Sequence, residues 1–205
     1  MTTAIFLIAF SFKIIGIDCA GCGPPLVKAL SAVPGVKNVK VDTKTSMATV
    51  DIAAGFDKSK LRAAVSNAGF EAEFPGETRI DIAPLPPEVV KTLDIVAYDG
   101  KSKVDIAKAL APGKVTVLDF YADWCGPCHV LEARLQRYML AHPKVALRRI
   151  DIGKWNNAGA RQATQFGAEA LPYVRVYDAK GKLVEAVVGG MWDEVLEAME
   201  KAEKR

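Results

Sequence analysis

The sequence is poor in cysteine and histidine, with four cysteines and two histidines in 205 residues. So few cysteines exclude the dense disulfide framework that stabilises many small secreted domains. Lysine and arginine number 27 against 24 acidic residues, and no long basic run occurs, so the sequence gives no support to nucleic-acid binding. The hydrophobic content of 50% is enough for buried cores and excludes a mainly disordered chain.

The sequence also lacks a hydrophobic run long enough to cross a bilayer. The apolar stretch over residues 4–10 is far shorter than the roughly 20 residues that a spanning helix needs. It has no basic segment before it and no convincing cleavage site after it. We therefore expect no stable membrane span, a strand over residues 10–17 and a cytoplasmic location. A degenerate export signal, with a location in the periplasm or cell envelope, is the alternative.

The four cysteines form two C-x-x-C pairs, Cys19 with Cys22 and Cys125 with Cys128. Cysteines paired at this spacing are typical of metal binding or of thiol-disulfide chemistry. The two pairs lie in different halves of the chain, so we expect two domains with separate chemistry.

The first domain is predicted over residues 1–76, where strand and helix patterns alternate. A strand precedes the first cysteine pair, and Pro24 and Pro25 open a helix directly after it. A hairpin over residues 36–52, a helix after Asp57 and a last strand over residues 70–74 follow. The predicted order βαββαβ is that of a ferredoxin-like domain.

Prolines gather in residues 77–91 outside any periodic pattern, as in an extended and fairly stiff linker. Residues 92–205 then alternate strands and helices around a central run of β-branched residues at 115–121. The predicted fold class is α/β (α+β), with domains at 1–76 and 92–205 joined by the linker.

The second cysteine pair lies where the strand 115–121 gives way to a helix. The first turn of a helix has unpaired N–H groups and the positive end of the helix dipole, and both favour a thiolate at Cys125. We expect Cys125 to be an exposed nucleophile of low pKa. Cys128 lies on the same helical face and can resolve the mixed disulfide that Cys125 forms with a substrate.

The segment from Asp119 to Cys128, DFYADWCGPC, resembles the active-site segment of the thioredoxin family. The resemblance implies a thioredoxin fold over the C-terminal domain and a protein dithiol-disulfide oxidoreductase that needs no cofactor at its redox site. It makes Cys125 the nucleophile and Cys128 the resolving thiol, with Trp124 before them. It also implies that Asp119 is a buried proton relay and that Pro172 is a cis-proline that aligns the substrate.

Several residues leave alternatives open. The cysteine pair on its own also fits a structural zinc half-site, and Asp119 also fits an ordinary strand-end carboxylate. Many thioredoxins have lysine and threonine where this chain has His129 and Leu171, which puts partner choice in doubt, and His129 is expected at the surface. Trp155 lies in a stretch longer than in a minimal thioredoxin and is either a packing residue or a substrate platform. The family's basic residue near the aspartate is not assigned between Arg148 and Arg149.

The first cysteine pair lies on a loop before a helix, where two soft thiolates can bind one thiophilic ion in near-linear geometry. The segment from Gly16 to Cys22 resembles the heavy-metal-associated domain of copper chaperones, copper pumps and mercury-binding proteins. The resemblance implies Cu(I) at Cys19 and Cys22, with Hg(II) or Zn(II) as other candidates. Ile17 occupies the family's usual methionine position. The alternative is a domain that uses the pair for redox chemistry, or for nothing.

These features predict a thioredoxin-type enzyme with an attached soft-metal-binding domain. The expected partners are protein disulfide substrates, an upstream thiol reductase and metal-transport proteins. The alternative is a metallochaperone in which the thioredoxin-like domain serves only for docking.

Overall fold

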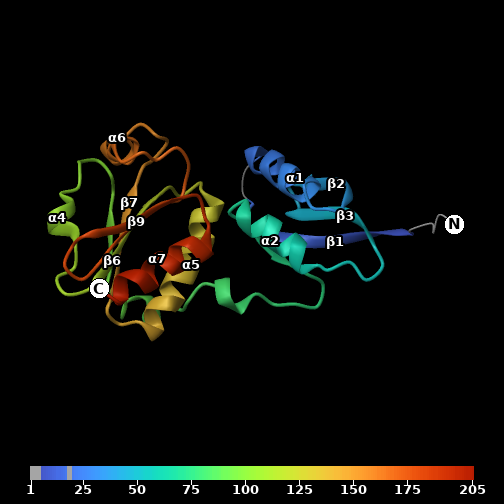
Figure 1. Cartoon of the computed structure of the whole chain (residues 1–205). Helices are drawn as coiled ribbons and strands as arrows, with labels where there is room; N and C mark the ends of the chain where they lie inside the picture. The colour runs from blue at the N-terminus through green and yellow to red at the C-terminus, as the bar shows by residue number, and fades with distance from the viewer. Residues whose placement is uncertain (1–5, 18–19) are drawn as a thin grey trace. The chain divides into compact units, whose positions relative to one another are not determined.

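The computed structural model describes residues 6–17 and 20–205. The described residues form two units that divide between Arg79 and Ile80. Each unit has its own sheet (Figure 1). Each also has its own buried apolar residues.

The N-terminal unit has the βαββαβ order expected from the sequence. Its elements are β1 (Leu7–Ile15), η1 (Ala20–Cys22), α1 (Gly23–Ser31), β2 (Lys37–Asp42), β3 (Met47–Ala53), α2 (Ser59–Asn67) and β4 (Glu71–Glu73). The strands form an antiparallel sheet in the order β2-β3-β1-β4. This is the predicted ferredoxin-like fold.

Alternation along β1 divides the N-terminal sheet into a buried and an exposed face. Phe12 and Ile14 are buried, whereas the alternating residues Ser11 and Lys13 are exposed. The buried face packs against Leu26 and other apolar residues of α1 and α2. Burial of each large apolar side chain contributes about 1.5–3 kcal/mol, so this face holds the two helices on the sheet.

The segment expected to be a linker, residues 77–91, contains local structure. Its elements are η2 (Ile80–Ile82) and α3 (Pro87–Val90). Arg137 on α5 (Gly126–Ala141) donates two hydrogen bonds to the carbonyl of Ala83, at 2.8 and 3.2 Å, and Ile82 is buried. Elements of three or four residues are too short to show a hydrophobic period, so the sequence pattern did not indicate them.

The C-terminal unit is a five-stranded mixed sheet between two layers of helices. Besides η2, α3 and α5, its elements are β5 (Ile95–Tyr98), α4 (Ile106–Ala109), β6 (Val115–Tyr121), β7 (Val145–Asp151), α6 (Ala158–Gln165), β8 (Tyr173–Tyr177), β9 (Leu183–Val188) and α7 (Trp192–Glu203). The strand order is β5-β7-β6-β8-β9, with β5, β7 and β6 parallel and β8 and β9 antiparallel. The arrangement agrees with the predicted thioredoxin fold.

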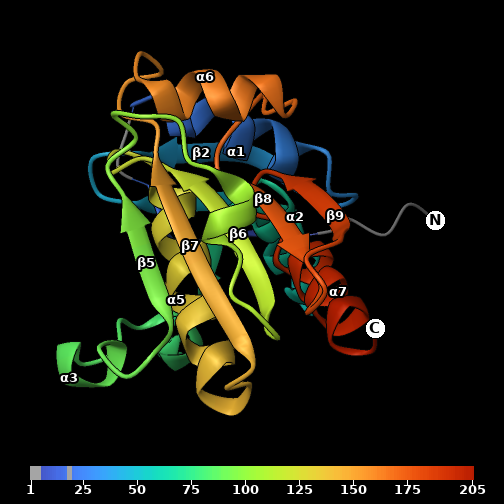
Figure 2. The same cartoon turned by 90° about the vertical axis from the view of Figure 1, so that its left-hand side faces the viewer.

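The two faces of this sheet carry separate clusters of buried residues. Apolar residues of α5 and α7 cover one face, and residues of α4 and α6 belong to the cluster on the other. Figure 2 shows α5 and α7 behind the strands. The middle strand β6 is buried from Val115 to Phe120. Its carboxyl end leads through residues 122–125 into α5, and this turn positions the cysteine pair.

None of the helices in the described residues combines the length and the apolar content that crossing a membrane requires.

Candidate functional site

Cys125 and Cys128 form a disulfide with an S–S distance of 2.03 Å. Cys125 is the N-cap of α5, and its Sγ accepts a hydrogen bond from the backbone N–H of Cys128 at 3.2 Å. This N-cap role confirms the expected place of Cys125 at the beginning of a helix. The expected exposure of Cys125 is wrong for the oxidised form, because the residue is only 5% exposed. The disulfide ties its sulfur to Cys128, which is fully buried.

Trp124 lies in the turn directly before the cysteine pair. Its side chain is exposed, and its indole Nε1 donates a hydrogen bond to the carbonyl of Gly153 at 2.7 Å. Gly153 belongs to the loop that follows β7, so this bond joins the β6–α5 turn to the β7–α6 loop. His129, expected at the surface, is exposed, and its Nε2 lies 2.9 Å from the carbonyl oxygen of Asp123.

Asp119 is completely buried on β6, on the side of the sheet that faces α5. Its Oδ2 accepts a hydrogen bond from Nε of Arg149 at 3.2 Å. Removal of the carboxyl from water raises the pKa of Asp119 to about 6, even though the nearby Arg149 guanidinium lowers it. Asp119 is therefore an acid that changes charge near neutral pH, which an ordinary exposed aspartate does not do.

The basic partner of Asp119, which the sequence left open between Arg148 and Arg149, is Arg149. Its Nη1 lies 2.8 Å from Glu132 Oε1, and its guanidinium stacks 3.7 Å from the ring centre of Tyr121. Arg148 points to the other face of β7, where it donates to Asp94 and to the carbonyl of Ala109. Successive strand residues face opposite sides, so only one of the two arginines can meet Asp119. The feature that identifies the partner of Asp119 is the register between β6 and β7, which pairs Asp119 with Arg149.

The Leu171–Pro172 peptide bond is cis, as the resemblance implied. Pro172 is buried, and its neighbours Leu171 and Tyr173 pack in the same cluster as Cys125 and Cys128. The structure thus brings Cys125, Cys128 and the segment around Pro172 into one cluster. The catalytic roles of Asp119, Trp124 and Pro172 remain predictions.

The expected metal site is described only in part, because Cys19 lies outside the described residues. Cys22 is 8% exposed and directly precedes α1. Ile17, at the family's methionine position, belongs to the core of the N-terminal unit. Thiolate sulfur is a soft ligand, so the donor set of a C-x-x-C pair fits a thiophilic ion. Residues 6–17 and 20–205 contain no group of three or more His, Cys, Asp or Glu placed to hold a metal ion.

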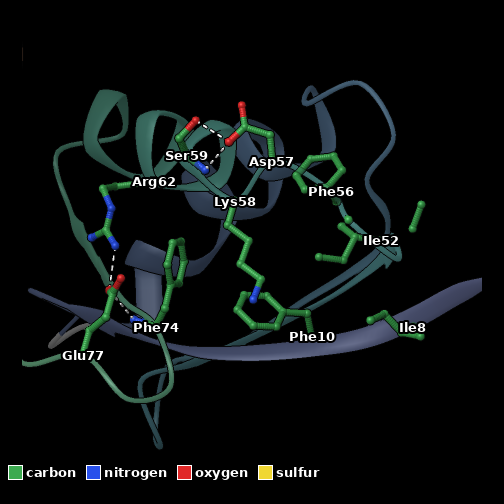
Figure 3. A pocket seen from close by; sticks show the side chains of 12 residues that line it. Ile8, Phe10, Ile52, Phe56, Asp57, Lys58, Ser59, Arg62, Phe74 and Glu77 are labelled. Carbon is green, nitrogen blue, oxygen red and sulfur yellow. Dashed lines mark hydrogen bonds and ion pairs between the residues drawn. The ribbon is translucent and has the colours of Figure 1, made fainter.

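A separate hollow of about 680 Å³ lies in the N-terminal unit, where β1 begins and α2 begins. Figure 3 shows the side chains that line it. Arg62 is fixed there by Glu77 at 2.6 Å and by the ring of Phe74 at 4.5 Å, and Lys58 lies 4.3 Å above the ring of Phe10. Of the predicted site residues that the structure describes, none lines this hollow.

Comparison with known proteins places both halves of the chain. The sequence model of the Thioredoxin family matches residues 100–201, and that of the Heavy-metal-associated domain matches residues 11–71. Thioredoxin of Chlamydia muridarum is 38% identical over 88 residues, which are 43% of this chain and 80% of that protein. Chloroplastic Thioredoxin F of Oryza sativa is 33% identical over 95 residues, which are 46% of this chain but only 48% of that protein.

A solved structure of oxidized MerP from Ralstonia metallidurans is 28% identical to the part that it matches. The match covers 34% of this chain and 99% of that one, with a TM-score of 0.32. The identity to the chlamydial protein over most of its length, and the match of the family model to residues 100–201, decide the assignment. The chain belongs to the thioredoxin family and carries a heavy-metal-associated domain ahead of its thioredoxin domain.

Proposed function

We propose that this chain reduces disulfide bonds of other proteins through Cys125 and Cys128, and that its N-terminal domain binds a soft metal ion through Cys19 and Cys22. The observation that carries the redox proposal is the disulfide at the N-terminus of α5, with Cys125 as the N-cap. A thiolate at this position is stabilised by the N–H of Cys128 and by the helix dipole.

The proposed reaction begins with the dithiol form. The Cys125 thiolate attacks one sulfur of the substrate disulfide, which forms a mixed disulfide and releases the other sulfur as a thiolate. Cys128 then loses its proton and attacks Cys125 Sγ. This second step breaks the mixed disulfide, releases the substrate as a dithiol and leaves the Cys125–Cys128 disulfide seen in the structure.

Asp119 supports the second step as the group that accepts the proton of Cys128. It is buried on the strand that leads into the cysteine turn, and its pKa of about 6 lets it exchange a proton near neutral pH. Among the described protein atoms its Oδ1 has no hydrogen-bond partner, whereas its Oδ2 is held by Arg149. One carboxylate oxygen is thus fixed and the other is free to take the proton.

For the N-terminal domain we propose Cu(I) as the ion, with Hg(II) and Zn(II) as the other candidates. Two thiolates suit the low coordination number and the softness of Cu(I). Cys22, which is disulfide-bonded in this structure, is one ligand in its reduced form, and Cys19 is the other by the C-x-x-C spacing. The ion is cargo in this proposal and takes no part in the disulfide exchange.

Each turnover oxidises the cysteine pair, so the enzyme needs a reductant, and we propose an upstream dithiol reductase for this role. The presence of the N-terminal metal-binding domain supports the proposal that the substrates are metal-handling proteins with oxidised cysteines. A reducing role also supports a cytoplasmic location, where thiols are kept reduced. The domain limits 1–76 and 92–205 remain our proposal.

Insulin reduction with dithiothreitol as the recharging reductant tests the redox function. We expect turnover by the wild-type chain and by Cys22→Ser, and none by Cys125→Ser. Cys128→Ser should attack but not resolve, so it should accumulate a mixed disulfide with its substrate. If wild type and Cys125→Ser are equally inactive, the thioredoxin domain does not act as an enzyme and the docking interpretation gains support.

A further inference from the structure

Trp155 is an exposed tryptophan near the redox site that the proposed chemistry does not use. It lies in the loop of residues 152–157 between β7 and α6 and is 39% exposed. In the described part of the chain it belongs to neither buried cluster of the C-terminal unit. Packing in the core therefore does not explain a tryptophan at this position.

The loop that carries Trp155 is held by several hydrogen bonds. The Gly153 N–H donates to Asp151 Oδ1 at 2.8 Å, and the Trp155 N–H donates to the carbonyl of Ile152 at 3.1 Å. The side chain of Asn157 donates to the carbonyl of Asp151 at 2.9 Å and also caps α6. The tryptophan is thus presented on a fixed loop.

The backbone of Trp155 has a φ of 59°, in the left-handed region. Bulky residues adopt this conformation only at a cost in free energy, whereas asparagine and glycine tolerate it. Residues held in such conformations cluster at active sites and ligand-binding sites. An exposed tryptophan at a strained position therefore points to a role outside folding.

Two hydrogen bonds bring this loop to the cysteine turn. Trp124, the residue before Cys125, donates its indole N–H to the carbonyl of Gly153 at 2.7 Å. The Ile152 N–H donates to the carbonyl of Tyr121 at 2.9 Å. Trp155 is two residues beyond Gly153, so their Cα atoms are at most about 7 Å apart. Both loops follow the carboxyl ends of the parallel strands β6 and β7 and share one edge of the sheet.

We propose that Trp155 is a specificity-determining residue, which contacts a large apolar side chain beside the cysteine of a protein disulfide. The inference rests on the proposed reduction of protein disulfides. Tryptophan offers a large rigid apolar surface and is enriched among the residues that dominate binding energy at interfaces. The preferred substrates are segments with an aromatic or large aliphatic residue within a few positions of the reacting cysteine.

The test compares the full-length chain with Trp155→Asn, because asparagine fits the left-handed backbone. The substrates are two cyclic disulfide peptides that differ only in flanking phenylalanine or serine, and hydroxyethyl disulfide. We expect kcat/KM to fall roughly tenfold for the phenylalanine peptide and less than about twofold for the other two. Trp155→Phe should restore most of the loss, and the midpoint of thermal unfolding of Trp155→Asn should equal or exceed that of wild type.

Leu140→Ala is the matched control. Leu140 is 49% exposed at the far end of α5, about 22 Å along the helix from Cys125, so its removal should leave all three substrates unchanged. Equal losses for all substrates, no loss for any, or a lower unfolding midpoint for Trp155→Asn overturns the role of Trp155. Failure of the wild-type chain to reduce any of the three instead overturns the proposed function itself.

Discussion

Arg149 and Asp119 form an ion pair in the interior of the C-terminal unit, with Nε 3.2 Å from Oδ2. The pair does not give Asp119 the low pKa of a typical salt-bridged aspartate. Arg149 divides its guanidinium between Asp119 and Glu132, and the loss of hydration at a fully buried carboxyl outweighs the attraction that remains. The fold thereby keeps a carboxyl whose ionised form is destabilised by burial. This carboxyl lies close to the end of β6 that leads into the cysteine turn.

The first prediction concerns the stability of Asp119→Asn. The pKa of Asp119 is about 6 in the folded chain and 3.8 in the unfolded reference. A raised pKa means that the folded state binds the proton more tightly, so the stabilisation is complete below about pH 4 and is lost as the pH rises through about 6. The difference between the two pKa values corresponds to about 3 kcal/mol in the free energy of unfolding. The free energy of unfolding of Asp119→Asn, taken relative to that of wild type, should therefore increase by about this amount as the pH rises from 4 to 8.

Urea denaturation of the oxidised proteins at a series of pH values measures this difference. Asp151→Asn, on the neighbouring strand β7, serves as the comparison for general effects of losing one carboxylate. A constant difference between Asp119→Asn and wild type across this pH range would show that Asp119 does not titrate as described.

The second prediction concerns Arg149 as the residue that positions Asp119. Arg149→Met removes the cation and leaves the carboxyl buried without its partner, so the pKa of Asp119 should rise further. The pH at which the mixed disulfide of Cys125 is resolved at half its maximal rate should rise with it. Rapid-mixing kinetics with a fluorogenic disulfide over pH 5–9 measures this profile.

Arg149→Lys keeps the positive charge and should return the profile most of the way toward wild type. Arg148→Met is the control, because Arg148 faces Asp94 on the opposite side of β7. A profile that shifts equally in Arg148→Met and Arg149→Met would contradict a specific role for Arg149.

The contrast between the two arginines shows what the sequence could and could not predict. The spacing of apolar residues predicts most elements of both sheets to within a few residues, because strands and helices with one buried face have clear periods. The pair of Cys125 and Cys128 could be predicted from the sequence, because its spacing and its position before a helix are local features. The partner of Asp119 depends on the register between β6 and β7, and the packing of Ile82 and Ala83 depends on a helix some fifty positions away. Such long-range pairing leaves no local pattern.

The third prediction concerns the reactivity of the reduced cysteines. In the oxidised structure Cys125 is 5% exposed and accepts the N–H of Cys128, whereas Cys128 is fully buried. In the dithiol form, iodoacetamide should modify Cys125 at a pH well below the ordinary thiol pKa of about 8.5 and should leave Cys128 largely unmodified. Peptide mass spectrometry after short exposures measures both rates. Equal rates at the two cysteines would remove the assignment of Cys125 as the nucleophile.

The last prediction concerns the metal-binding domain. In the full-length Cys125→Ser/Cys128→Ser chain, which keeps only the first pair, we expect one Cu(I) per chain. Binding should be lost when Cys19 or Cys22 is also changed to serine, because one thiolate alone does not provide two-coordinate sulfur ligation.

Pro24 and Pro25 lie in the first turn of α1 and have no N–H to donate, so the helix offsets the charge of the bound thiolates with fewer donors than usual. Pro24→Ala/Pro25→Ala should therefore bind Cu(I) more tightly, by a factor on the order of 2–5. Competition with a chromogenic Cu(I) chelator measures both effects. Cu(I) retained at full stoichiometry after loss of both Cys19 and Cys22 would place the site elsewhere, and unchanged affinity in the double proline variant would show that the first-turn amides make no contribution.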